Sequence, residues 1–215
     1  EHAIYPISNY GSSMAPFYST LAIWVGGIVL VAMLKVTVAE STVSKLRNPK
    51  AHQFYIGRSI LLLGVGLLQS GLICLGDLFY LQIQCEHPFL FLLAGWFTSI
   101  VYVSIIYALT VSFGDIGKAI CVVLLVMQVA GSGGTFPIEV APEFFQKVYP
   151  LLPFTHSMNA MRECIAGFYG NTYWKELGTL ALFLIPALLL GLVLRKPVIR
   201  LNDAFTEKLE STHLI

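Results

Sequence analysis

A segment rich in glycine and proline, residues 131–163, interrupts a chain that otherwise consists of long apolar runs. Its sequence, GSGGTFPIEVAPEFFQKVYPLLPFTHSMNAMRE, is apolar enough to stay near lipid. Glycine and proline break it too often for one continuous transmembrane helix. The segment therefore predicts a membrane-embedded gate or cap, and it decides how the neighbouring runs are assigned.

The apolar runs have the lengths of transmembrane helices. The chain is 56% hydrophobic and 12% charged, with a mean hydropathy of +0.75, whereas a soluble domain is about 25% charged. A helix needs about 20 apolar residues to cross about 30 Å of hydrocarbon. The predicted spans are residues 17–38, 59–81, 89–113, 119–135 and 177–194, the fourth of which includes part of the break.

The sequence thus predicts an all-α membrane protein with one membrane domain, residues 17–194. Five transmembrane helices are expected there, together with a re-entrant or interfacial outer helical hairpin over residues 136–176. Residues 195–215 form a tail after the last span.

Basic residues are sorted by side along this topology. Nine Lys and Arg residues fall in the linker 40–58, the turn 114–118 and the tail, all on one side. By the positive-inside rule this side is cytoplasmic, in a bacterial cell membrane, so residue 1 is predicted outside and residue 215 inside. Residues 1–16 are then an extracellular leading segment. Because they lack the basic flank of a signal peptide, we expect the chain to be the C-terminal part of a longer or processed protein.

The linker 40–58 has two interpretations. It can be a solvated basic loop that contacts anionic lipid, or a short interfacial helix that binds a cytoplasmic partner such as an ATPase. For the second interpretation, the candidate coupling residues are Lys45, Leu46, Arg47, Lys50 and Phe54.

The second predicted span carries a stripe of glycines and one acid. Gly57, Gly64 and Gly71 recur every seven residues and share one helix face. Small residues allow another helix to approach closely, either within the chain or from a second subunit. Asp77 lies near the outer end of this span, where it is either a functional acid or an interfacial residue that reaches water.

The outer segment predicts two helices, each too short to span. Pro142 is placed to open the first helix, and Thr155 to cap the second. The second has an apolar face formed by Met158, Met161, Ile165 and Phe168. The candidate cap residues of the whole segment are Gly131, Gly133, Gly134, Pro137, Pro142, Pro153 and Arg162.

Two further pairs fall in outer segments. Arg162 and Glu163 are adjacent, so they do not share a helix face and each must bond elsewhere. Cys85 and Cys164 are both predicted outside, where they form a disulfide or remain as two thiols.

Residue patterns typical of catalysis are missing from the sequence. There is no GxxxxGK phosphate loop, the histidines lack metal-ligand spacing, and no nucleophile stands beside an evident base. We therefore predict a protein that is not an enzyme, with no catalytic, cofactor-binding or metal residues and no nucleic-acid partner.

Two motifs resemble known families. The run SGGTFPIEVAPEFF, followed by YPLLPFTHSMNAMRE, resembles the end of type-2 ABC exporter permeases, which have a short fifth helix, two outer re-entrant helices and a final sixth helix. The opening YPISNYGSSMAPFYSTLAIWVGG is similar to the start of the C-terminal membrane domain of the YhgE/Pip (phage infection protein) family. Together the motifs frame nearly the whole chain.

The resemblance implies a fold and a set of partners. The five spans would equal helices two to six of the permease fold, and residues 40–58 would occupy the coupling position that contacts the ATPase. The implied function is export or secretion across the cell membrane by a homodimer, working by alternating access with an ATPase or secretion-system components. One alternative is a membrane scaffold for an extracellular stalk, as a type VII secretion component or phage receptor. Another is an ordinary type-2 ABC permease.

Overall fold

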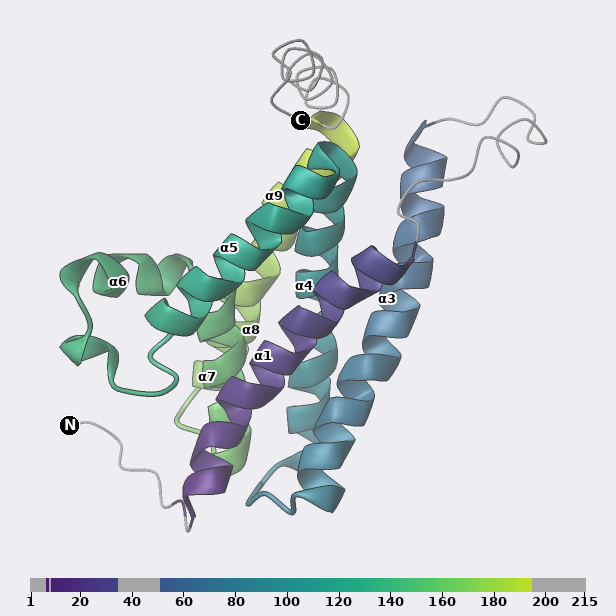
Figure 1. Cartoon of the computed structure of the whole chain (residues 1–215). Helices are drawn as coiled ribbons and strands as arrows, with labels where there is room; N and C mark the ends of the chain where they lie inside the picture. The colour runs from purple at the N-terminus through teal and green to yellow at the C-terminus, as the bar shows by residue number, and fades with distance from the viewer. Residues whose placement is uncertain (1–6, 8, 35–50, 195–215) are drawn as a thin grey trace.

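The computed structural model describes residue 7, residues 9–34 and residues 51–194, and this part of the chain is helical without strands (Figure 1). The predicted all-α fold is confirmed. The elements are α1 (Tyr10–Met33), α3 (Ala51–Leu75), the π-helix η1 (Gly76–Tyr80), α4 (Pro88–Phe113), α5 (Asp115–Gly131), η2 (Ile138–Val140), α6 (Glu143–Val148), η3 (Tyr149–Leu151), α7 (Pro153–Ala166), α8 (Thr172–Leu182), α9 (Leu184–Leu189) and the π-helix η4 (Leu190–Leu194). Of the candidate coupling residues, Lys45, Leu46, Arg47 and Lys50 lie outside the described residues, and Phe54 lies in the first turn of α3.

Among the described residues, four helices are long and apolar enough to cross a membrane: Tyr10–Met33, Tyr55–Tyr80, Pro88–Phe113 and Thr172–Val193. The predicted span 119–135 corresponds to α5, which begins and ends earlier than expected. Its 17 residues rise about 25 Å, less than the roughly 30 Å of a hydrocarbon core.

Three helices begin well before their predicted spans. Helix α3 begins at Ala51 rather than at residue 59. The predicted first span starts at residue 17, but α1 begins at Tyr10, where the Asn9 side chain accepts the Ser12 N–H at 2.8 Å and caps the helix. Similarly, α8 begins at Thr172 rather than at residue 177, so Glu176 becomes part of a helix.

Helix α4 is the centre of the bundle and is surrounded by α1, α3, α5, α7 and α9. Its Tyr102 is fully buried and meets the Trp24 ring of α1 edge to face, with ring centres 4.8 Å apart. Hydroxyls of Ser104 and Thr110 donate back to carbonyls of their own helix at 2.7 Å. Because lipid is as apolar as these side chains, close packing such as that of Tyr102 on Trp24 holds the bundle together, while the two hydroxyl bonds satisfy polar groups within α4.

The glycine stripe of the second span divides in the structure. Gly71 is buried against the Trp96 indole, 3.1 Å from where a Cβ would lie. Gly57 and Gly64 are exposed, and a Cβ at either would meet nothing within 4 Å. Within the part of the chain that the structure describes, no other helix therefore packs on these two positions. A close approach to backbone occurs at Gly117, where an added Cβ would overlap the Leu109 carbonyl.

Several segments that position the candidate functional site come together at one end of the bundle. We call it the loop end, because residues 81–87 connect η1 to α4 there. The start of α1 lies at this end, since the Ser12 hydroxyl accepts the Gln84 N–H at 2.8 Å. The last turn of α7 lies there too, since the Cys164 carbonyl accepts the N–H groups of Glu86 and His87, both at 3.1 Å.

Candidate functional site

The predicted break follows α5 directly and depends on glycine. Gly133 has φ = 64°, a left-handed conformation that favours glycine. A Cβ at Gly134 would overlap the Phe17 ring of α1, and one at Gly131 would lie 3.0 Å from Leu152 Cδ1. The break therefore packs closely on α1 and on the residues that precede α7.

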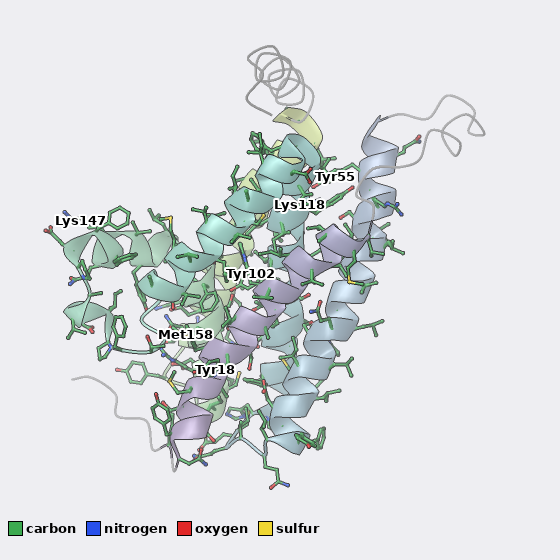
Figure 2. All side chains as sticks on the ribbon, viewed as in Figure 1. Tyr18, Tyr55, Tyr102, Lys118, Lys147 and Met158 are labelled. Atoms are coloured by element: carbon green, nitrogen blue, oxygen red, sulfur yellow. The ribbon has the colours of Figure 1, made fainter. Side chains whose placement is uncertain are left out.

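Beyond the break, η2, α6 and η3 form an arm that projects from the bundle (Figure 1). Pro137 directly precedes η2, and Pro142, which was predicted to open a helix, directly precedes α6. The Gln146 side chain donates to the carbonyls of Glu139 at 3.1 Å and Ala141 at 2.8 Å, which folds the arm on itself. Lys147 lies on the exposed arm (Figure 2), paired with Glu143 at 2.7 Å.

Helix α7 returns into the bundle and is buried along most of its length. It begins at Pro153 and packs against α1, α4 and α8. The predicted apolar face is present, because Met158, Met161 and Ile165 are fully buried. Polar positions of the same helix are buried as well, so α7 lies inside the bundle and not on its surface.

Two expectations about α7 were wrong in detail. Thr155 does not cap the helix, because α7 already starts at Pro153, whose fixed φ suits the first helical position. Phe168 lies beyond the helix, which ends at Ala166 before Gly167 adopts φ = 96°. Residues 153–166 therefore form the buried helix.

The buried polar side chains of α7 are bonded to neighbouring elements. The Tyr102 hydroxyl of α4 donates to Ser157 Oγ at 2.9 Å, and Ser157 donates to the Pro153 carbonyl at 2.9 Å. The Asn159 amide donates to the Tyr149 hydroxyl at 3.2 Å and to Glu176 Oε1 at 3.4 Å. These bonds connect α7 to α4, η3 and α8.

His156 forms the strongest polar contact between α7 and α8. Its Nε2 donates to the Pro150 carbonyl at 3.0 Å, because that carbonyl has no proton to give. Its Nδ1 lies 2.6 Å from Glu176 Oε2, so the two side chains share one further proton. Burial lowers the pKa of His156, but the bonds to Glu176 and to the Pro150 carbonyl outweigh burial and raise the pKa above its ordinary value.

The adjacent charges Arg162 and Glu163 bond in different directions, as their positions required. Arg162 Nη2 donates to the Gly133 carbonyl at 3.2 Å and contacts the Gly134 carbonyl at 3.5 Å. Glu163 Oε2 accepts the Tyr169 N–H at 2.6 Å. Arg162 thus joins α7 to the break, whereas Glu163 holds the turn that leads to α8.

A cavity of about 280 Å³ lies beside the first turn of α7. It is lined by α1, α4, α5 and α9, with Trp24 and Leu124 among its apolar walls. Gln128 is its polar wall residue and is 1% exposed. Gln128 Oε1 accepts the Phe154 N–H at 3.2 Å, which satisfies one free donor of the α7 start, and its Nε2 has no partner among the described residues.

The cysteines at the loop end are thiols in this structure. Cys85 Sγ donates to the Cys164 carbonyl at 3.3 Å, and both residues are free. Burial raises the pKa of both thiols, so both are protonated at neutral pH.

Of the predicted cap residues, the structure brings Arg162 to Gly133 and Gly134. The three prolines lie apart from them, at the starts of η2, α6 and α7: Pro137, Pro142 and Pro153. Sequence reasoning missed Gln128 and the pairing of His156 with Glu176. Neither had a local signal, because His156 and Glu176 belong to different helices and meet only after folding.

A polar helix buried among membrane-length helices, attached to them by a glycine-rich break, defines a multi-pass membrane protein of the permease class. The chain belongs to the family described as ABC-2 family transporter protein, whose match covers residues 4–193. It is also similar to the uncharacterized protein YhgE of Bacillus subtilis (strain 168), with 29% identity over 180 residues. That similarity covers 84% of this chain and 23% of the relative, so the chain spans about a quarter of that protein's length. No solved structure matches the chain.

Proposed function

We propose that this chain is the membrane domain of a bacterial exporter in which α7 acts as a movable cap. The observation that carries the proposal is the burial of α7: a helix with His156, Ser157 and Glu163 at buried positions lies inside a membrane bundle. Polar groups at such depth are tolerated where they are bonded or line a wet cavity.

The backbone on both sides of α7 can absorb a movement. Gly133 precedes the helix and Gly167 follows it, and both adopt left-handed φ values that glycine reaches at low cost. The bonds that hold α7 in place run to four other segments through a few side chains. Such a helix can exchange between two positions without unwinding a transmembrane helix.

ABC-2 permeases usually work with an ATPase, and we propose the same for this protein, as a homodimer. The coupling surface would be the linker 40–58, through Lys45, Leu46, Arg47, Lys50 and Phe54. The exposed glycines Gly57 and Gly64 offer a face for a second subunit, because small residues allow close helix approach. The orientation proposed is the one predicted from charge, with the loop end outside.

Cys164 provides a native probe of α7 movement, because it is fully buried in the closed arrangement. The intact protein would retain Cys164 as its single cysteine and would be labelled in cells with a membrane-impermeant maleimide. If α7 is a cap, energised cells should label Cys164 faster than cells depleted of ATP. A matched variant that retains only Cys121, buried in α5, reports general loosening.

Equal, slow labelling of Cys164 in energised and depleted cells would contradict the cap. That result would favour the second candidate, a scaffold that anchors an extracellular stalk for secretion-system assembly or phage adsorption. One observation supports the scaffold: the cavity beside α7 is mostly apolar, with Gln128 as its polar wall. Cross-linking from residues 45–50 that captures an ATPase subunit would favour the exporter, and its repeated failure the scaffold.

A further inference from the structure

The cavity of about 280 Å³ beside the first turn of α7 has mostly apolar walls. None of the described residues that line it is Asp, Glu, Lys, Arg or His. The Trp24 indole N–H already donates to the Cys121 carbonyl at 3.2 Å, so it is not free to bind a ligand. Because burying a charge without a partner is costly, these walls suit a neutral, largely apolar molecule.

Gln128 supplies an amide to this wall, and one hydrogen bond fixes its orientation. The side chain accepts the Phe154 N–H at 3.2 Å, and only the amide oxygen can accept. The amide nitrogen is therefore turned away from the α7 backbone. Gln128 is 1% exposed, and its Nε2 has no partner among the described residues. Buried donors are nearly always bonded, so this nitrogen needs an acceptor.

The helix ends beside Gln128 do not favour an ion of either sign. Gln128 lies in the last turn of α5, whose C-terminal end carries partial negative charge. The first turn of α7 carries partial positive charge and meets the same amide. At Phe183, where α8 ends and α9 begins, opposite helix ends also meet. These opposite ends offset each other, so the acceptor that the amide needs is a neutral one.

The cavity lies open to the lipid-facing side of the bundle. Leu151 of η3 is 68% exposed, Pro186 of α9 is exposed as well, and both line the cavity. Pro186 belongs to the membrane-length helix Thr172–Val193, whose side chains Ile185 and Leu189 are also exposed. A molecule dissolved in the bilayer can therefore reach the cavity between η3 and α9.

A water molecule is a poorer occupant than an apolar molecule that carries an acceptor. A buried water makes about three hydrogen bonds, and Gln128 Nε2 is the free side-chain donor that the described walls provide. A carbonyl oxygen is satisfied by one donor, and the rest of its molecule would cover the apolar walls. A dry cavity of about 150 Å³ binds benzene, so a larger one accommodates a ring or short chain with one ester or amide group.

We propose that this cavity binds a neutral, apolar molecule through one carbonyl oxygen, which accepts a hydrogen bond from Gln128 Nε2. An ester or amide provides such an oxygen. The ester can belong to an acyl chain of a membrane lipid or to a free apolar molecule, since both present the same group. The site is formed by α5, α7 and α9 as they stand, so it does not depend on movement of α7.

The test uses the fluorescence of Trp24, which lines the cavity and is 1% exposed. The intact protein would retain Trp24 as its single tryptophan, in nanodiscs of ether-linked phosphatidylcholine, which has no ester. Bromine quenches an indole that it contacts. Methyl 4-bromobenzoate therefore reports binding of an ester, and 1-bromo-4-sec-butylbenzene reports binding of a hydrocarbon of the same size.

We expect saturable quenching by both probes. At equal concentration in the bilayer, the ester should bind about five- to tenfold more tightly, which is the effect of one neutral hydrogen bond. Gln128→Leu should abolish this preference, because leucine fills similar space without a donor. The hydrocarbon should still quench Trp24 in that variant, which shows that the cavity persists. The matched control is Gln69→Leu, an amide of α3 that lines a different cavity and should leave the preference unchanged.

Three results would overturn the proposal. They are equal binding of both probes by the parent protein, an ester preference that survives in Gln128→Leu, and quenching that rises without saturation, which reports partition into the bilayer alone. The first and third results are measured on the parent protein, so they decide the question even if Gln128→Leu does not fold.

The lipid linkage distinguishes the two sources. If a lipid ester occupies the cavity, nanodiscs of ester-linked phosphatidylcholine should weaken binding of methyl 4-bromobenzoate by competition. If the occupant is a free molecule, the affinity should be the same in both lipids. Cap movement, reported by Cys164 labelling, is a separate measurement, so either proposal can fail alone.

Discussion

Arg162 fastens the glycine-rich break to α7, and its removal should loosen that break locally. Its guanidinium donates to the Gly133 carbonyl at 3.2 Å, with a weaker contact to the Gly134 carbonyl at 3.5 Å. A hydrogen bond from a charged donor is worth about 1.5–3 kcal/mol, and the partial exposure of Arg162 places it at the low end. We expect Arg162→Ala to lower the free energy of local opening by about 1.5 kcal/mol, or about tenfold in the opening equilibrium.

Lys147→Ala is the matched control, because it removes a basic residue of the same outer segment. Its pair with Glu143 is solvent-exposed and spaced i,i+4, a geometry worth about 0.3–0.5 kcal/mol. Hydrogen exchange measured by mass spectrometry on the intact protein in nanodiscs would report residues 131–137 directly. Exchange there should rise about tenfold in Arg162→Ala and less than about threefold in Lys147→Ala.

Two results would refute this reasoning. Equal protection of residues 131–137 in both variants would mean that the Arg162 bonds contribute nothing. A loss of protection spread evenly through α4 would mean that Arg162 stabilises the whole bundle, and not the break.

Two other perturbations follow from the packing and the charges. Gly117→Ala should lower the free energy of unfolding by about 2 kcal/mol, because its methyl group overlaps the Leu109 carbonyl. Gly178→Ala has open space, so its effect on the free energy of unfolding, followed by thermal denaturation, should be neutral or stabilising by up to about 1 kcal/mol. Glu176 raises the pKa of His156, so the protection of α7 against hydrogen exchange should be complete below about pH 6.5 and should fall as the pH rises through the raised pKa. His156→Gln should remove this pH dependence. An unchanged pH profile in that variant would contradict the prediction.

Apolar length is a local property, and the sequence alone therefore located the membrane-length helices well. The span predicted at residues 89–113 matches α4, Pro88–Phe113, almost residue for residue. The starts of α1 and α8 were misplaced because they depend on capping and turn geometry outside the apolar run. An Asn9 side chain can extend a helix by two turns without changing its hydropathy.

Contacts between distant residues were beyond sequence reasoning. Periodicity placed Gly57, Gly64 and Gly71 on one face, but only the fold shows that Trp96 covers Gly71 and that none of the described residues covers the other two. Likewise, the buried polar positions of α7 became intelligible only with their partners on α4 and α8. The break itself was predictable, because glycine and proline limit the backbone directly.

The break separates α5 from α7, and this separation has a consequence for how α7 can move. Helix α5 has 17 residues and rises about 25 Å, and α7 has 14 residues and rises about 21 Å. Figure 1 shows α5 running from the α4 turn toward the break, and α7 continuing to the loop end. Helices α5 and α7 are thus two separate pieces, with the arm between them.

One continuous helix in place of α5 and α7 could move its second half only by breaking backbone hydrogen bonds inside the membrane. Each broken bond there costs several kcal/mol. The two-piece arrangement avoids that cost, because the backbone already leaves the helix at Gly131. If α7 moves as we propose, it exchanges side-chain bonds such as Tyr102 to Ser157 and Arg162 to Gly133. These bonds are few and individually modest, so an ATPase partner could supply enough free energy to break them together, while the transmembrane helices stay intact.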